Sequence, residues 1–167
     1  MKLTPKKKKI IDAVIERLRK FPKAYNQKTW GMRISKSIAP CGTACCIAGD
    51  IALVTDIDPK CLIEVFISPN DIPDRQIRSK VDFFGIDIQD YGALALGLSD
   101  DEANTLFTPE PFKGDIFNSY WPEPFRSQWK QAGRLKEKQA TVAIEYLTYI
   151  RDTGDVLCEK HPERQPV

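Results

Sequence analysis

The chain has 167 residues, of which 42% are hydrophobic and 29% are charged, and its formal net charge is +2. This composition is typical of one globular domain that can bury a core without disulfide or metal staples. No uncharged run is long enough to span a bilayer, and Asp12, Glu16 and Arg17 interrupt the first apolar stretch. We therefore expect neither a membrane span nor a signal peptide.

The charges are unevenly distributed along the chain. Residues 1–36 carry twelve Lys or Arg and two acids, whereas residues 82–123 carry nine acids and one Lys. Weak nucleic-acid binding by the basic N-terminal helix is one interpretation, but no aromatic platform accompanies its lysines. We favour charge complementarity within the chain or between copies, which predicts a protein partner or self-association and no nucleic acid.

The N-terminal segment predicts a helix over residues 4–21. Thr4 is a typical helix cap and Pro5 suits the first helical position. Pro22 ends the helix because the residue before a proline avoids helical angles. Apolar residues recur at helical spacing, at Ile10, Ile11, Val14, Ile15 and Leu18. Residues 25–36 are predicted to form a loop anchored by Trp30.

Residues 38–54 contain three of the five cysteines and a single charge, Asp50. We predict a helix over 44–54, capped by Thr43 and apolar on nearly every side, which is typical of a buried central helix. Small residues form two rows that let another helix approach closely, Ala44, Ala48 and Ala52, and beside them Cys45 and Gly49. A carboxylate in such a helix needs a partner, for which we expect a loop arginine such as Arg33.

The second half of the chain alternates short elements with turns. Residues 62–67 and 81–86 are candidate strands of one small hairpin, because both are rich in β-branched and aromatic residues. Residues 107–129 hold seven of the sixteen aromatic residues between four prolines and predict an irregular cover over the core. A last helix is predicted over 135–153 and ends at Gly154.

Two short helices are predicted at 87–96 and 100–107, separated by Gly97 and by a capping box formed by Ser99 and Glu102. The spacing mimics a helix-turn-helix, but the second helix begins with three acids and contains no Lys or Arg. Acids at the start of a recognition helix would repel DNA phosphates. We therefore expect a compact helical corner and no DNA readout.

The cysteines raise the possibility of thiol or metal chemistry. Cys45 or Cys46 near a helix N-terminus would feel the positive end of the helix dipole, which lowers a thiol pKa and suits a thiol-dependent enzyme. Such an enzyme needs a base, and the only histidine lies in a polar C-terminal segment. A metal site could use Cys41 and Cys45, which are four residues apart, together with Cys61, Cys158 or His161. Structural zinc sites rarely use this spacing. We favour buried structural thiols in a cytoplasmic protein, without metal or cofactor.

A surface for a protein partner is a further alternative, because Tyr and Trp are residues that interfaces favour. The candidates all lie in the proline-rich segment and comprise Phe112, Phe117, Tyr120, Trp121, Phe125 and Trp129. The same rings would otherwise seal the core from outside. The sequence does not choose between these two roles, and it identifies no small-molecule ligand.

Three motifs occur together in this chain: C-G-T-A-C-C-I-A-G at 41–49, L-G-L-S-D-D-E-A-N-T-L-F at 96–107, and Trp121-Pro122. In this combination the chain resembles, over most of residues 20–154, a set of small uncharacterised bacterial and phage proteins that carry C-G-T-x-x-C-[I/L]-A-G. The position of Asp50 is often aromatic in that set. The resemblance implies a mostly helical fold, and it implies no activity and no catalytic residue.

We therefore predict a mainly α fold, a single-domain helical bundle around the buried 44–54 helix, with or without one small β-hairpin. The N-terminal and C-terminal helices are expected to pack on that central helix. The domain is predicted to span residues 1–158 and to be followed by a disordered tail at 159–167. The predicted function is a small cytoplasmic, non-enzymatic interaction or accessory protein, with a thiol enzyme and weak nucleic-acid binding as alternatives.

Overall fold

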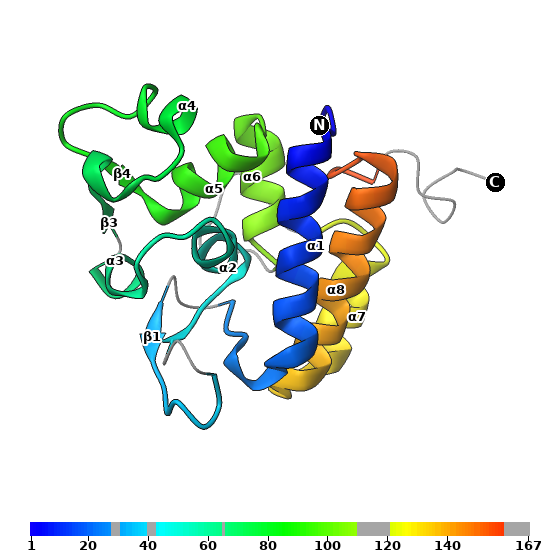
Figure 1. Cartoon of the computed structure of the whole chain (residues 1–167). Coiled ribbons are helices and arrows are strands. Elements are labelled where there is room, and N and C mark those ends of the chain that lie inside the picture. The colour runs from blue at the N-terminus through cyan, green and yellow to red at the C-terminus, as the bar shows by residue number, and fades with distance from the viewer. Residues whose placement is uncertain (28–30, 40–42, 65, 110–120, 159–167) are drawn as a thin grey trace, which may run out of the picture.

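The computed structural model describes residues 1–27, 31–39, 43–64, 66–109 and 121–158. Helices dominate the described residues, so the predicted mainly α fold is confirmed (Figure 1). In chain order the elements are α1 (Pro5–Lys20), η1 (Pro22–Ala24), β1 (Met32–Arg33), β2 (Thr43–Ala44), α2 (Ile47–Val54), α3 (Pro59–Glu64), β3 (Phe66–Ile67), η2 (Pro69–Asp71), α4 (Arg75–Arg78), β4 (Ile86–Asp87), α5 (Ile88–Leu96), α6 (Asp100–Phe107), α7 (Phe125–Ala132) and α8 (Lys136–Thr153). The predicted tail at 159–167 lies outside the described residues.

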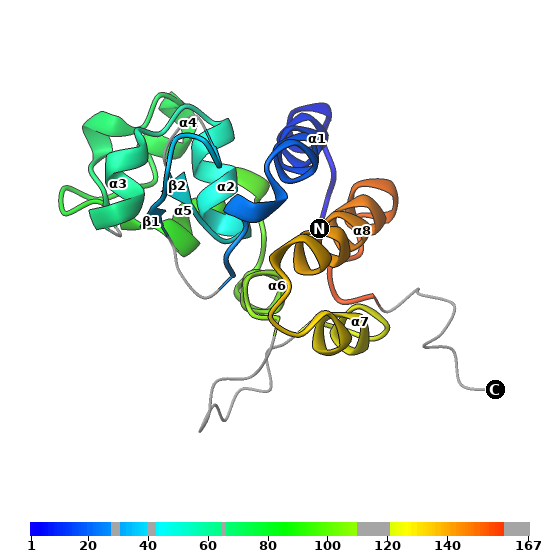
Figure 2. The same cartoon turned by 90° about the horizontal axis from the view of Figure 1, so that it is seen from below.

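Helix α1 lies between α2 and α8 and packs against both (Figure 2). The Thr4 hydroxyl accepts a hydrogen bond from the Lys7 amide at 3.3 Å, and Pro5 occupies the first helical position, as predicted. The buried stripe of α1 consists of the five predicted apolar residues, Ile10, Ile11, Val14, Ile15 and Leu18. The C-terminal helix α8 packs on α1 and α7, so the expectation that it packs on the central helix is wrong.

Helix α2 is buried from Ile47 to Ala52 and packs closely against α5. The small residues permit this approach, because a Cβ placed on Gly92 of α5 would lie only 3.5 Å from the Cβ of Ala48. The helix begins at Ile47 and not at the predicted residue 44, and Cys46 rather than Thr43 takes the cap position. The predicted first turn is extended because its backbone pairs with distant segments, in part through the Cys45 amide, which donates to the Ala24 carbonyl at 3.1 Å.

The strands form two antiparallel pairs, β1–β2 and β3–β4. The first pair joins Met32 to Ala44 and Arg33 to Thr43, so it links the segment predicted to be a loop with the predicted start of the central helix. The second pair confirms a small pairing between the two predicted strand regions, but it covers only two residues on each side. Half of the predicted strand at 62–67, residues 62–64, is instead part of helix α3, which begins at Pro59.

The predicted corner between α5 and α6 is present. Gly97 adopts a left-handed conformation with φ of 61° and ends α5, while the Ser99 hydroxyl and the Glu102 carboxylate form the capping box of α6. Glu102 also accepts a hydrogen bond from the Met1 amino group, which donates as well to the Gly154 carbonyl at 2.9 Å. Among the described residues, every helix is too short or too polar to cross a membrane.

Aromatic side chains from α7, α8 and the segment before α7 complete the core. The Trp121 ring lies 5.0 Å from the Trp129 ring and 5.1 Å from the Tyr146 ring, measured between centroids. Its indole N–H donates to the Leu106 carbonyl at 2.8 Å, which satisfies the only polar atom of a fully buried side chain. Residues 125–132 form helix α7, so the predicted irregular cover is wrong over that part of the segment.

Candidate functional site

A charged cluster lies in the interior where α1 crosses the start of α2. Arg17 is in the last part of α1, and Asp50 is in the first turn of α2. The Arg17 Nε donates to Asp50 Oδ1 at 2.6 Å, and the Cys45 thiol donates to the same oxygen at 3.1 Å. A second Arg17 nitrogen, Nη2, donates to the Thr43 carbonyl at 3.3 Å. The partner of Asp50 is therefore Arg17 and not the expected Arg33, which is exposed in β1.

Burial controls the protonation of this cluster. Asp50 is only 2% exposed, and burial raises its pKa to about 6, although the Arg17 guanidinium lowers it. Burial and then the nearby negative charge of Asp50 raise the pKa of Cys45 well above its ordinary value. Burial also raises the pKa of Cys46 to about 12, even though backbone amides at the start of α2 lower it. Both thiols therefore stay protonated near neutral pH.

These observations bear on the thiol candidates. A carboxylate lies within hydrogen-bonding reach of Cys45, which is one half of what a thiol enzyme would need. The other half is access for a substrate, and both Cys45 and Cys46 are fully buried. The thiolate is the reactive form, so a buried protonated thiol is inert. His161 and Cys41 lie outside the described residues. Among the described residues, no group of three or more His, Cys, Asp or Glu side chains is placed to hold a metal ion.

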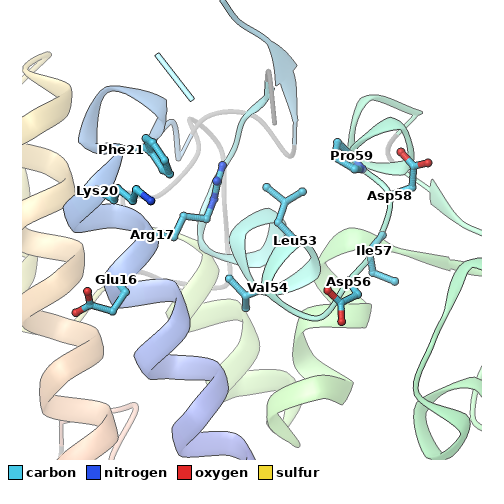
Figure 3. Close-up of a pocket in the computed structure, with 10 residues that line it drawn as sticks. All are labelled: Glu16, Arg17, Lys20, Phe21, Leu53, Val54, Asp56, Ile57, Asp58 and Pro59. Atoms are coloured by element: carbon cyan, nitrogen blue, oxygen red, sulfur yellow. The ribbon is translucent and has the colours of Figure 1, made fainter. Parts of the chain in front are cut away.

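An open groove of about 860 Å³ lies over the cluster, between the end of α1 and the segment that joins α2 to α3 (Figure 3). Its apolar lining consists of Phe21, Leu53, Val54, Ile57 and Pro59. Charged side chains complete the lining and comprise Glu16, Arg17, Lys20, Asp56 and Asp58. Figure 3 shows the residues at the end of α1 on one side, residues 56–59 on the other, and Leu53 and Val54 of α2 between them. The arrangement suits binding of an apolar group surrounded by polar contacts.

Arg17 belongs to both the groove and the buried cluster. Its guanidinium lies 5.9 Å from the centre of the Phe21 ring, and the Lys20 ammonium lies 5.4 Å from the same ring. Such cation–aromatic contacts hold Phe21 at the groove wall. Asp50 and Cys45 do not line the groove, so the buried cluster reaches it only through Arg17.

The predicted partner residues are not brought together on the surface. Trp121 and Trp129 are both buried, because their rings pack against Tyr146 and Tyr25 and fill the core. Neither can belong to an accessible partner surface, and that part of the prediction is wrong. Phe125, weighed with them, is also buried. The other candidates, Phe112, Phe117 and Tyr120, lie outside the described residues.

Sequence reasoning missed both the groove and two exposed aromatic residues, Phe83 and Phe84. The groove is formed by the end of α1, the end of α2 and the segment before α3, so no local sequence pattern predicts it. The adjacent phenylalanines do carry a signal, because neighbouring residues of a strand point to opposite faces and one ring would then face solvent. Comparisons of the chain with protein-family models, with curated proteins and with solved structures found no match.

Proposed function

We propose that this protein is a small non-enzymatic interaction protein, and that the groove between α1 and the α2–α3 segment receives an apolar side chain of a protein partner. The observation that carries the proposal is the groove itself, whose lining combines five apolar residues with five charged ones. Interfaces of this kind place an apolar anchor in a pocket and surround it with a polar rim.

The chemistry beneath the groove supports binding over catalysis. A thiol-dependent enzyme would need Cys45 or Cys46 as an accessible thiolate, whereas burial raises the pKa of both thiols. Cys45, Cys46 and Cys61 are buried free thiols, and Cys158 is buried as well. Free thiols suit a reducing compartment, and we place the protein in the cytoplasm on that basis.

The test uses a groove variant and a matched control. Leu53→Lys puts a charge on the apolar side of the groove, and Ile144→Lys makes the same change at another half-buried position, on α8. Tagged wild type and both variants are used to isolate cross-linked partners, which are quantified by mass spectrometry. A partner retained by wild type and Ile144→Lys but lost from Leu53→Lys supports the proposal. Equal recovery by all three proteins, at equal thermal stability, contradicts it.

Weak polyanion binding is a second candidate, favoured by a basic end of the bundle. The turn between α7 and α8 lies beside the end of α1 (Figure 1), and Lys23 pairs with Glu137 at 3.8 Å across that junction. The cations gathered there are Arg19, Lys20, Lys23, Lys130, Arg134, Lys136 and Lys138. Lys6, in the N-terminal lysine run, is instead paired with Asp74. Fluorescence anisotropy with a single-stranded oligonucleotide tests this candidate, and absence of binding at low salt excludes it.

A further inference from the structure

The groove and the basic end of the bundle meet at Lys20, the last residue of α1. The surface continues from there over η1, which packs on α8. The ammonium of Lys23 in η1 lies 3.8 Å from the carboxylate of Glu137 in the first turn of α8. Figure 2, which views the molecule from this end, shows the end of α1 beside the start of α8. A segment bound in the groove can therefore extend over Lys20 to the start of α8.

The basic end carries more positive charge than its own acids balance. Apart from Arg17, whose charge pairs with the buried acid of α2, residues 16–23 and 130–138 contain seven cations and two acids. Both acids are already paired with cations of this end, at 2.6 Å and 3.8 Å. Glu145, the next acid along α8, leaves the balance positive. The other five cations form no ion pair with any residue that the structure describes, and they are Lys20, Lys130, Arg134, Lys136 and Lys138.

Helix stability explains only some of these cations. Lys20 and Lys130 are in the last turns of α1 and α7, where the helix dipole favours a cation. Lys136 and Lys138 instead lie in the first turn of α8, where the dipole disfavours them. Departures from local helix preference are expected at functional sites. The lysines that follow Pro5 depart in the same way, but they lie at the opposite end of α1 from the groove and therefore supply a control (Figure 1).

The groove itself favours a peptide over a nucleic acid. Asp56 and Asp58 lie on the side opposite α1 (Figure 3), so an evenly charged phosphate backbone would be repelled there. A peptide can place one apolar side chain on Leu53 and Val54 and carry its acids only on the side toward Lys20. The charges of the two sites therefore suit a segment that is acidic on one side of an apolar anchor.

We infer that the groove and the basic end together bind an acidic segment of a protein partner, with an apolar side chain in the groove and carboxylates on the cations of the basic end. This inference rests on the proposed function of the groove and names the chemistry of its partner. Opposite charges speed the encounter and also set the direction of the segment, because its acids must lie toward α8 and away from Asp56 and Asp58.

Fluorescence anisotropy of the full chain with labelled synthetic peptides tests the inference at low salt. The probe peptide carries one phenylalanine followed by six glutamates. One control peptide has serine in place of the phenylalanine, and another has lysines in place of the glutamates. The probe should bind with an affinity that falls as salt is added, and both control peptides should bind at least about tenfold more weakly. Absence of binding between the probe and wild type overturns the inference.

Two matched double variants locate the acidic side of the bound peptide. Lys136→Gln/Lys138→Gln removes two charges from the basic end, and Lys8→Gln/Lys9→Gln removes two charges near the other end of α1, so both proteins have the same net charge. The first should raise the dissociation constant at least about fivefold, and the second should bind nearly like wild type. Equal dissociation constants for the two variants contradict the inference.

Leu53→Lys tests the apolar anchor independently of charge. This variant adds a positive charge to the protein, yet it should bind the acidic probe at least about tenfold more weakly, because it places an ammonium on the apolar lining. A single-stranded oligonucleotide is the comparison ligand. If it binds as tightly as the probe, and Leu53→Lys leaves both affinities unchanged, the basic end binds any polyanion and the inference fails.

The failure of this inference is distinguishable from the failure of the proposed function. If cross-linking shows that Leu53→Lys loses a partner that Lys136→Gln/Lys138→Gln retains, the groove binds a partner that is not acidic, and only the inference fails. If both variants retain every partner, the proposed function fails as well. Far-ultraviolet circular dichroism and thermal unfolding of each variant confirm that it is folded.

Discussion

Replacing Asp50 with Asn tests how the interior holds a carboxylate. Two effects oppose each other at this side chain. Burial favours the neutral acid, while the Arg17 Nε, 2.6 Å from Oδ1, favours the charged form. Burial is the larger effect, so the pKa of Asp50 rises from an ordinary 3.8 to about 6 in the folded protein. The ionised pair is thus a source of pH-dependent instability, as buried ion pairs can be.

The sign and size of the effect follow from this shift. Because the pKa of Asp50 is higher in the folded than in the unfolded chain, its contribution to stability is fully present below about pH 4 and is lost as the pH rises through about 6. A shift of about two units corresponds to about 3 kcal/mol. Asn resembles the neutral acid and does not titrate. The free energy of unfolding of Asp50→Asn should therefore gain about 3 kcal/mol relative to wild type between about pH 4 and pH 7.

Urea unfolding of both proteins at several pH values measures this difference. Other carboxylates titrate alike in the two proteins and cancel, and any fixed cost of the Asn side chain is the same at every pH. The thiols of Cys45 and Cys46 and the phenol of Tyr25 have raised pKa values and stay neutral in this range. If wild type instead gains stability over Asp50→Asn as the pH rises, the attraction of Arg17 outweighs burial and the reasoning is refuted. In Arg17→Met the loss of stability should extend to higher pH, since the guanidinium lowers the pKa of Asp50.

Three further predictions concern the core and the caps. Cys45 and Cys46 should resist alkylation in the native protein from neutral to mildly alkaline pH and should react only on unfolding, because burial raises the pKa of both thiols. Mass spectrometry follows the labelling, and rapid labelling of the native protein would support the thiol-enzyme alternative. Trp121→Ala should lower the free energy of unfolding by about 3–5 kcal/mol in urea, because it empties a buried site and removes the indole hydrogen bond to the Leu106 carbonyl. Ser99→Ala should cost about 0.5–2 kcal/mol through the lost capping box, and an unchanged midpoint would show that the box is dispensable.

Helix ends were predictable where the signal is local. Thr4 with Pro5, and Ser99 with Glu102, place the required cap atoms within three residues of the amides that they satisfy. Gly154 likewise ends α8 with a φ of 72°, in the left-handed conformation that glycine adopts most readily. These features depend on neighbours in the chain, and the sequence shows such neighbours directly.

Features that depend on distant residues were not predictable in the same way. The start of α2 lies three residues later than expected, because the Cys45 backbone pairs with the segment around Ala24 and Asn26. Asp50 was recognised as a buried acid in need of a cation, but its partner Arg17 is 33 residues away on a different helix. Helix periodicity cannot choose between Arg17 and Arg33, since the choice depends on how α1 crosses α2. The groove also depends on how α1 crosses α2, and helix periodicity did not predict it for that reason.

Arg17 explains why the groove suits an apolar partner although a cation lines it. The Nε of Arg17 is directed inward to Asp50, and Nη2 donates to the Thr43 carbonyl. The guanidinium also lies over the Phe21 ring, 5.9 Å from its centre. The negative charge of Asp50 offsets the charge of the guanidinium, so Arg17 attracts a carboxylate on a partner less strongly than an arginine without an acid beside it. An aromatic or aliphatic side chain does not depend on that attraction, because it contacts the apolar stem of Arg17 and the apolar residues of the groove.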